Sequence, residues 1–326
     1  MINIDDVFDE DVYLELHPDV AAAVAAGTLK SGKEHYDIYG KDECRIINRS
    51  LKPQVPREHA VFHLIDKNGL GIEVGPSHNP IAPKKNGYNV HIVDLATAEE
   101  LRTKYLGHNL NLDNIEEVDF VWKGQPLSEL IDKKECYDWI ISSHVIEHIP
   151  DIISFFQQCE KLLKPSGILS LVVPDKRYCF DYFQQLSSTG LLLDAYMEKR
   201  TRPSPGQVFD HFSNASKRNN AIAWCLDEQG GGADALIHNL TDTVAQWRKS
   251  IESTEYIDVH CWRFIPESFR LIMSDLAMLG LTNLRIKAEF PTNGCEFYVS
   301  LGKESGLVMN NDNDRLKSLV NIKQYY

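Results

Sequence analysis

The sequence predicts an α/β protein built on a mostly parallel, seven-stranded sheet that ends in an antiparallel hairpin. Short apolar segments alternate with helical stretches between residues 70 and 180, which is the pattern of parallel strands joined by helical crossovers. Two more apolar segments near the C-terminus are separated only by PTNG, and so short a turn permits only antiparallel pairing. With 43% hydrophobic residues among 326, the chain can build a full core.

The first 50 residues are expected to form a separate helical module. Apolar side chains from Phe8 to Val24 recur roughly at helical spacing. Pro18 is suited to the first position of a second helix, and Gly27 to the end of that helix. Residues 51–60 then combine two prolines with few apolar side chains, which indicates a linker.

The central region is predicted to contain five strands with a later insert. The strands cover residues 69–74, 88–95, 118–122, 137–143 and 168–174, and an amphipathic helix covers 151–164. Residues 181–260 interrupt the alternation with Tyr, Asn, Gln, Gly and His, and we interpret them as a helical insert. The sheet domain would therefore consist of residues 61–180 and 261–304, with a helix at 266–281 and hairpin strands at 284–290 and 295–303. Residues 305–326 are expected to be a loosely held polar tail.

Composition argues against several classes of protein. The chain has 47 acidic and 34 basic residues, a net charge of −13, whereas duplex nucleic-acid binding needs clustered Lys and Arg. No apolar window is long enough for a membrane span, and the acidic start MINIDDVFDEDV does not resemble a signal peptide. Seven scattered cysteines are typical of reduced thiols. We therefore expect a soluble cytoplasmic protein that does not bind nucleic acid.

Candidate ligand-binding residues lie where the first two strands end, because ligands of open α/β sheets bind at the carboxyl ends of strands. Gly75 follows the first strand, and a glycine there lets the backbone approach a ligand closely. Asp94 ends the second strand about 20 residues after Glu73, which suits an acid that accepts hydrogen bonds from ribose hydroxyls. As a strand-end acid, Asp94 is not expected in the core. The loop keeps a single glycine, so a dinucleotide cofactor is not expected.

Several longer segments resemble class I S-adenosylmethionine-dependent methyltransferases. GLGIEVGPSHNP is similar to the first motif of that family, and SSHVIEHIPD, LLKPSG and VVPD are similar to its region from the fourth strand to the fifth. The resemblance covers about 70–180 and 262–303 and implies a Rossmann-like fold with S-adenosyl-L-methionine as cofactor. Carried over by position, it implies a cofactor site made of Glu73, Gly75, Pro76, Ser77, Asp94, Leu95, Gln125, Ser143 and His144. The sequence departs from the family in the Pro-Ser-His of the loop and at Gln125, where many members carry an Asp.

The N-terminal module has its own resemblance. Its segment FDEDVYLELHPDV, with the later His-Tyr pair and Gly-x-x-Glu, is similar to a short helical repeat attached to bacterial glycan-modifying enzymes. That resemblance implies a docking or assembly element with a partner of its own, and a glycan-related acceptor.

Methylation of a hydroxyl oxygen requires a positioned base, and histidine suits this work because its pKa lies near neutral pH. The candidates are His144, His148, Asp175, Asp181, Asp210, His211, Asp258 and His260. We predict that His260 accepts the proton, that His211 or Asp181 binds the acceptor hydroxyls, and that His144 competes for the role of base. Glu147 and His148 could instead be structural residues at a helix start. The histidine spacing carries no metal-ligand signature, so no metal site is predicted.

The predicted function is O-methylation of a sugar or glycan intermediate of surface polysaccharide synthesis, with the insert covering the acceptor site. Two alternatives stay open. One is methylation of another small molecule or a peptide, and the other is a noncatalytic binding module with the methyltransferase fold. The sequence also leaves a homo-oligomer open.

Overall fold

The structure is a computed structural model that describes residues 8–40, 55–108, 110–225, 232–303, 306, 311–323 and 325. The chain divides into two compact units, Met1–Arg57 and Glu58–Tyr326. The division falls within the segment predicted as a linker. No helix among the described residues is both long and apolar enough to cross a membrane.

The first unit is helical in its described part. It contains α2 (Glu10–Leu16), α3 (Pro18–Ala25), α4 (Gly32–His35) and the π-helical turn η1 (Tyr36–Gly40). Pro18 occupies the first turn of α3, and Gly27 follows the helix with φ +72°, as expected for a residue that ends it. Tyr13 and Val20 form the centre of its small core. The buried His35 contributes Nδ1, which lies 3.0 Å from the Tyr13 hydroxyl.

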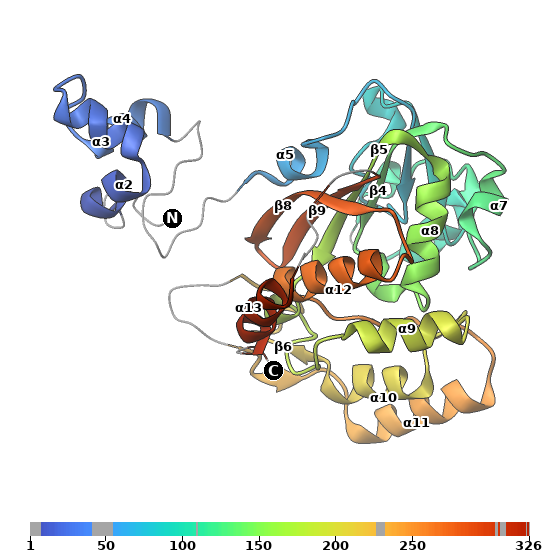
Figure 1. Ribbon diagram of the computed structural model, residues 1–326. Coiled ribbons are helices and arrows are strands. Elements are labelled where there is room, and N and C mark those ends of the chain that lie inside the picture. Colours follow the sequence, from blue (N-terminus) through green and yellow to red (C-terminus); the bar gives the residue numbers. More distant parts are fainter. Residues whose placement is uncertain are drawn as a thin grey trace. The chain divides into compact units, whose positions relative to one another are not determined.

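The second unit is built on a seven-stranded sheet in the order β3-β2-β1-β4-β5-β9-β8 (Figure 1). The strands are β1 (Gly71–Val74), β2 (Val90–Asp94), β3 (Phe120–Val121), β4 (Tyr137–Ser143), β5 (Leu163–Pro174), β8 (Arg285–Asn293) and β9 (Glu296–Gly302). The first five are parallel, whereas β9 runs antiparallel to both β5 and β8. The predicted fold class is therefore confirmed. Strand β5 begins earlier than predicted, because Leu163 already pairs with Tyr137.

Helices cover both faces of this sheet. Apolar side chains of α7 (Leu127–Ile131), α8 (Ile152–Leu162) and α12 (Pro266–Met278) share one large core cluster with Leu169 and Leu171 of β5. Successive strand residues point to opposite faces, so Ser170 faces the other way. There its hydroxyl donates to the backbone oxygen of Val61 in α5 (Arg57–Phe62) at 2.8 Å. Helix α6 (Ala98–Tyr105) follows β2 and contributes to a second cluster around Leu101.

The insert is helical, as predicted, and lies beyond one end of the sheet in Figure 1. It contains α9 (Thr189–Met197), α10 (Pro205–Asn214), α11 (Leu240–Glu252) and a small pair of strands, β6 (Ser216–Lys217) with β7 (Ala235–Leu236). Four short 3-10 turns complete the described elements of this unit: η2 (Lys84–Asn86), η3 (Leu112–Asn114), η4 (Ile146–His148) and η5 (Lys176–Tyr178).

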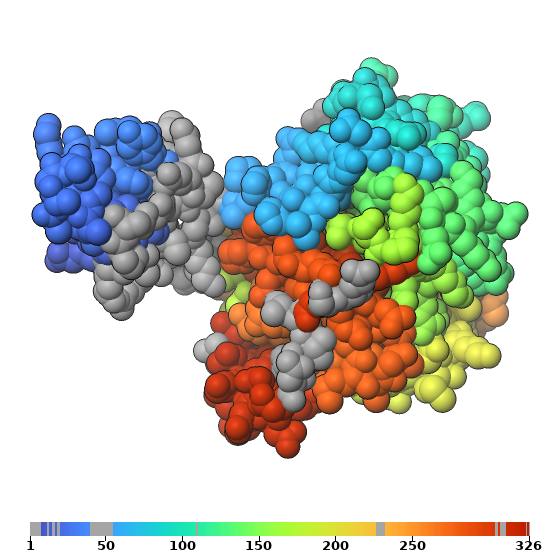
Figure 2. Space-filling model, turned by 45° about the horizontal axis from the view of Figure 1, so that its top comes forward, coloured from blue at the N-terminus to red at the C-terminus, as the bar shows by residue number. Residues whose placement is uncertain are grey.

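The C-terminal segment differs from the loosely held tail that the sequence predicts. Residues Asp312–Lys323 form helix α13, which packs beside α12 (Figure 2, red beside orange). Ile322 is buried against Leu186, Ile265 and Leu271. Arg315 forms an ion pair with Asp275 of α12. A few apolar side chains within a polar stretch are thus enough to dock this helix.

Candidate functional site

The loop after β1 turns sharply at Gly75, which is the glycine that the sequence singles out. Gly75 has φ +67°, a left-handed conformation that favours glycine. A Cβ at this position would lie 2.7 Å from Cγ2 of Val145, the second residue after β4. The glycine is therefore required both by the backbone conformation and by the close approach of β1 and β4 at their carboxyl ends.

Two buried carboxylates hold this loop from within. Glu73 accepts hydrogen bonds from the backbone N–H groups of Ile81 (2.6 Å) and Ala82 (2.9 Å). Asp94 accepts from Ser77 N at 2.8 Å and from its own neighbour Leu95 at 2.7 Å. Each acid is only 2% exposed, so the expectation that Asp94 lies outside the core is wrong. Burial raises the pKa of Asp94, although its two N–H donors act in the opposite direction.

The other predicted cofactor residues gather around the same strand ends. Ser77 also has a positive φ, and its hydroxyl hydrogen-bonds to that of Tyr105 at 2.8 Å. Leu95 directly follows Asp94 and is 51% exposed, so about half of this apolar residue is accessible. Gln125 uses its side-chain oxygen to accept from the Lys123 N–H at 2.7 Å, which stabilises its own turn. Lys123 in turn donates from Nζ to the Leu95 oxygen. Pro76 precedes Ser77 and accepts from Asn79 N.

His144 follows Ser143, the last residue of β4, in a strained backbone conformation. Its φ is +52°, which is uncommon for a residue with a side chain and often marks a functional site. The His144 N–H donates to Val172 of β5 at 3.0 Å. Its Nε2 lies 2.7 Å from Oε2 of Glu296, the first residue of β9. Three strands therefore position this imidazole.

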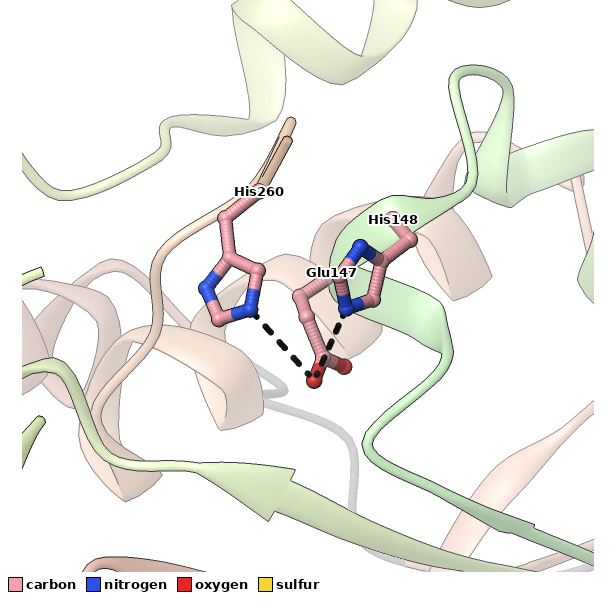
Figure 3. Close-up of side chains that lie close together, drawn as sticks. All are labelled: Glu147, His148 and His260. Carbon is pink, nitrogen blue, oxygen red and sulfur yellow. Dashed lines mark ion pairs between the residues drawn. The ribbon is translucent and has the colours of Figure 1, made fainter. Parts of the chain in front are cut away.

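Glu147 lies at the centre of a group of histidines (Figure 3). It is completely buried in η4, and neither of its carboxylate oxygens has a hydrogen-bond partner among the described residues. Three imidazole nitrogens surround its Oε1, namely Nδ1 of His144 at 3.7 Å, Nε2 of His260 at 3.9 Å and Nε2 of His148 at 4.0 Å. These separations are longer than hydrogen bonds, which join N and O atoms over 2.7–3.2 Å.

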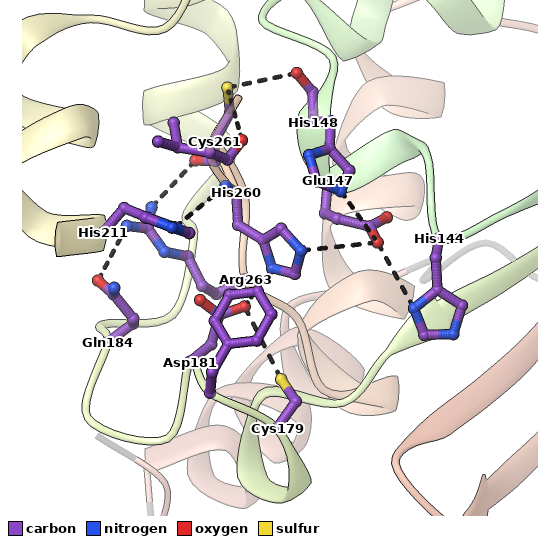
Figure 4. A network of polar contacts seen from close by, with 12 residues as sticks. His144, Glu147, His148, Cys179, Asp181, Gln184, His211, His260, Cys261 and Arg263 are labelled. Carbon is purple, nitrogen blue, oxygen red and sulfur yellow. Dashed lines mark hydrogen bonds and ion pairs between the residues drawn. The ribbon is translucent and has the colours of Figure 1, made fainter. Parts of the chain in front are cut away.

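A second carboxylate lies close to the far nitrogen of each of these imidazoles, and Figure 4 shows Asp181 beside His260. Nδ1 of the buried His260 lies 2.5 Å from Oδ2 of Asp181, and Nδ1 of His148 lies 2.8 Å from Oδ1 of Asp258. Burial alone would raise the pKa of Asp181, but His260 lowers it. Burial alone would lower the pKa of His148, but Asp258 and Glu147 raise it. Asp181 is therefore hydrogen-bonded to the His260 ring, whereas Asp258 lies in ion-pair range of His148.

His211 of α10 approaches the same cluster from the insert. Its Nδ1 accepts a hydrogen bond from the His260 N–H at 3.3 Å, and its ring lies 5.6 Å from that of Phe180. Burial lowers the pKa of His211 to about 4, so the ring is neutral near pH 7. The structure therefore brings together His260, His211 and Asp181, which the sequence predicts as a group.

A cavity of about 190 Å³ opens beside the cluster, beyond the ends of β4 and β5. Its lining includes the cluster residues His144, Glu147, His148 and His260, together with Ile222 of the insert and Phe180 just before it. Five sequence candidates are not among the described lining residues. Three of them, Asp181, His211 and Asp258, contact the histidines from outside the cavity. The other two have structural partners. Asp175 is buried and binds Arg177 and Thr292, which ties the end of β5 to the hairpin. Asp210 offers its backbone oxygen to Gln184.

Sequence reasoning missed part of this site. It considered Glu147 only as a residue at a helix start, and it did not consider Glu296, which lies 152 positions after His144. The Glu-His pair at 147–148 was a usable signal, since a carboxylate and an imidazole often serve together in a site. Glu296 gave no signal, because its position depends on the pairing of β9 with β5.

Comparison with known proteins gives a family for most of the chain. A family described as methyltransferase domain matches residues 47–276. Ubiquinone biosynthesis O-methyltransferase, mitochondrial, of Mus musculus is 31% identical over 74 residues, 22% of this chain and 20% of that protein. Ubiquinone biosynthesis O-methyltransferase of Rhodopseudomonas palustris strain TIE-1 is 34% identical over 50 residues, 15% of this chain and 20% of that protein. The chain thus spans about a fifth of the length of the curated relatives it matches.

A solved structure of an S-adenosylmethionine-dependent methyltransferase from Mesorhizobium loti is also similar. The alignment covers 76% of this chain and 98% of that protein's chain, with 11% sequence identity and a TM-score of 0.37.

Proposed function

Since the chain belongs to the methyltransferase domain family, we propose that it is an S-adenosylmethionine-dependent methyltransferase that methylates an oxygen of a sugar or glycan intermediate in surface polysaccharide synthesis. One observation carries the proposal. The loop held by Glu73 and Asp94 and the cavity beside His260 lie along the same carboxyl edge of one sheet. A cofactor and an acceptor bound at these two places would be neighbours, as methyl transfer requires.

The residues at the ends of β1 and β2 fit the cofactor. Gly75 leaves space where a Cβ would collide with Val145. The exposed Leu95 supplies an apolar surface for the adenine ring of the cofactor. Each Asp94 oxygen accepts one backbone N–H and retains capacity for a ribose hydroxyl, since a carboxylate has about four acceptor positions. When bound, S-adenosylmethionine supplies a methyl group already activated by its positively charged sulfur. We place its methionine end near Ser143 and His144.

The acceptor end of the proposed site relies on the Asp181–His260 pair. Because Asp181 accepts from Nδ1 of His260, that nitrogen keeps its proton and Nε2 presents a lone pair on the side of the cavity. The cavity volume of about 190 Å³ corresponds to roughly six water molecules, which is enough for one sugar ring or a group of similar size. The insert would close over this acceptor through Ile222, beside Phe180 at the end of the sheet domain.

The sugar acceptor is supported by the resemblance of the N-terminal module, which we propose as a docking element for a glycan-related partner. A second candidate acceptor is a small molecule with a hydroxylated ring. It is supported by the matches to ubiquinone biosynthesis O-methyltransferases, which include the 31% identity over 74 residues.

Two experiments test the proposal in sequence. Calorimetry with S-adenosylmethionine should detect one binding site per chain, and absence of binding up to millimolar concentration would leave only the noncatalytic binding module. Mass spectrometry of surface polysaccharide from a deletion strain should then reveal the loss of a methyl group. Complementation with the wild-type gene should restore that group, whereas the His260→Asn variant should not. An unchanged polysaccharide would instead favour the small-molecule acceptor.

A further inference from the structure

Glu147, His148 and His260 form a cluster that the methyltransferase fold does not by itself explain. Each offers one ligand atom, and these three atoms lie within 4.8 Å of one another (Figure 3). We propose that the three residues bind a divalent first-row transition-metal ion, with Zn²⁺ as the reference ion. The histidine spacing in the sequence does not indicate this site, because the fold brings His260 to a pair that precedes it by more than a hundred positions.

The buried carboxylate of Glu147 carries the first part of the argument. It is 0% exposed and has no hydrogen-bond partner among the described residues, and a buried unpaired charge is strongly unfavourable. If His148 and His260 compensated it as protonated donors, their Nε2 atoms should approach to 2.7–3.2 Å. The observed separations are 4.0 and 3.9 Å. A tetrahedral Zn²⁺ with ligands at 2.0–2.2 Å would hold ligand atoms roughly 3.3 Å apart. Binding would therefore shorten the two separations from Glu147 by about 0.6–0.7 Å, and the widest separation in the group, which is at most 4.8 Å, by no more than about 1.5 Å.

The positions of the two outer carboxylates also favour a metal site. Asp181 is hydrogen-bonded to Nδ1 of His260 at 2.5 Å. Oδ1 of Asp258 lies 2.8 Å from Nδ1 of His148 as an ion pair, without the alignment of a hydrogen bond among the described residues. Metal-binding histidines usually give their other nitrogen to a carboxylate in this way, because the contact fixes both the tautomer and the ring orientation. Nε2 of each ring then faces Glu147, at 4.0 Å for His148 and 3.9 Å for His260. A cation placed between the three atoms would compensate the carboxylate, which neither ring approaches to hydrogen-bond distance.

The ligand chemistry selects the class of ion. Two imidazoles and one carboxylate suit Zn²⁺, Mn²⁺ or Fe²⁺, whereas Mg²⁺ and Ca²⁺ prefer oxygen ligands alone. Three protein ligands leave a coordination position open, as in catalytic rather than structural sites. All three residues line the cavity, so a molecule in the cavity could occupy that position.

The role of the ion rests on the proposed function. An acceptor hydroxyl bound at the open position would have a lowered pKa and could release its proton to water near neutral pH. Nε2 of His260 would hold the ion and could not also take that proton. This proposal therefore replaces the role of general base that the sequence suggests for His260.

The test measures metal binding by the full chain after chelator treatment. Zn²⁺ titration calorimetry and elemental mass spectrometry should find one equivalent per chain, and Co²⁺ should give the visible absorption bands of a site with imidazole ligands. Glu147→Gln preserves the shape of the side chain and should weaken Zn²⁺ binding more than about a hundredfold, whereas Asp181→Asn should weaken it about 10- to 100-fold. His91→Gln is the matched control, because His91 of β2 is a partly buried histidine that hydrogen-bonds to Tyr137 and contacts no member of the cluster; the Zn²⁺ affinity of this variant should equal that of wild type.

Two results would overturn the proposal. The first is that the wild-type protein binds less than about one tenth of an equivalent of Zn²⁺ and of Co²⁺. The second is that the Glu147→Gln variant binds Zn²⁺ as tightly as wild type. Circular dichroism of each variant verifies folding, and the wild-type Co²⁺ spectrum decides the matter if a variant fails to fold. S-adenosylmethionine binding is measured on the same samples. Cofactor binding without metal binding refutes the metal site alone, whereas metal binding without cofactor binding refutes the proposed function alone.

Discussion

Replacement of Gly75 by alanine should destabilise the protein more than an equivalent change at another left-handed glycine. Gly75 has φ +67°, and its added Cβ would meet Cγ2 of Val145 at 2.7 Å. Gly87 also has a positive φ, of +89°, but an added Cβ would meet no described atom within 4 Å. Gly87→Ala therefore measures the cost of the backbone conformation alone, and Gly75→Ala adds the cost of the collision.

The two costs can be estimated separately. A left-handed conformation costs an alanine about 1–2 kcal/mol, and the forced displacement of a packed side chain costs about 1–3 kcal/mol. Valine is stiff about χ1, so Val145 cannot easily rotate away. Gly75→Ala should therefore lower the free energy of unfolding by roughly 2–5 kcal/mol, and Gly87→Ala by only about 1–2 kcal/mol.

Urea unfolding monitored by circular dichroism measures both variants, and a double-mutant cycle isolates the collision. Val145→Ala removes the atom in contact, so the double variant Gly75→Ala/Val145→Ala should recover about 1–3 kcal/mol relative to additivity. Gly75→Ala should also weaken S-adenosylmethionine binding at least tenfold, because the loop must shift, whereas Gly87→Ala should not. Equal destabilisation by the two single variants with no coupling to Val145 would refute the close approach of β1 and β4.

Three further predictions concern other buried groups. Asp94→Ala should lower the free energy of unfolding by about 1–3 kcal/mol and weaken cofactor binding in calorimetry, because Ser77 N and Leu95 N lose their acceptor; an unaltered unfolding curve would contradict this role. Burial raises the pKa of Asp94, so the ionised form is lost at a higher pH than in an ordinary aspartate, and cofactor affinity should fall as the pH decreases through that raised value in wild type but not in Asp94→Asn. Ile322→Ala should lower the free energy of unfolding by about 2 kcal/mol and should speed hydrogen exchange selectively in α13, since Ile322 lies on the buried side of that helix. Exchange in α13 at the same rate as in wild type would show that Ile322 does not hold the helix in place.

The fold was predictable because its signals are local. Strand β4 covers the predicted residues 137–143, and α12 begins at the predicted Pro266. Alternation of apolar segments with helical ones requires no knowledge of distant contacts. The C-terminal helix α13 was not predictable in this way, because a polar sequence docks through a few residues such as Ile322, whose partners lie far away in the chain.

The sequence by itself determined the order of strands and helices, the positions of Gly75 and Asp94 at strand ends, and the presence of histidines near the end of β4 and after the insert. Only the tertiary structure decided which of these side chains meet. The pairing of Ser143 with Val172 and of Glu296 with Pro174 brings Glu296 to His144, and the return of the chain from the insert brings His260 to Glu147. A shift in the register of β9 by one residue would turn Glu296 to the opposite face of the sheet, away from His144. Register and packing are properties of the whole core, and spacing along the chain does not encode them.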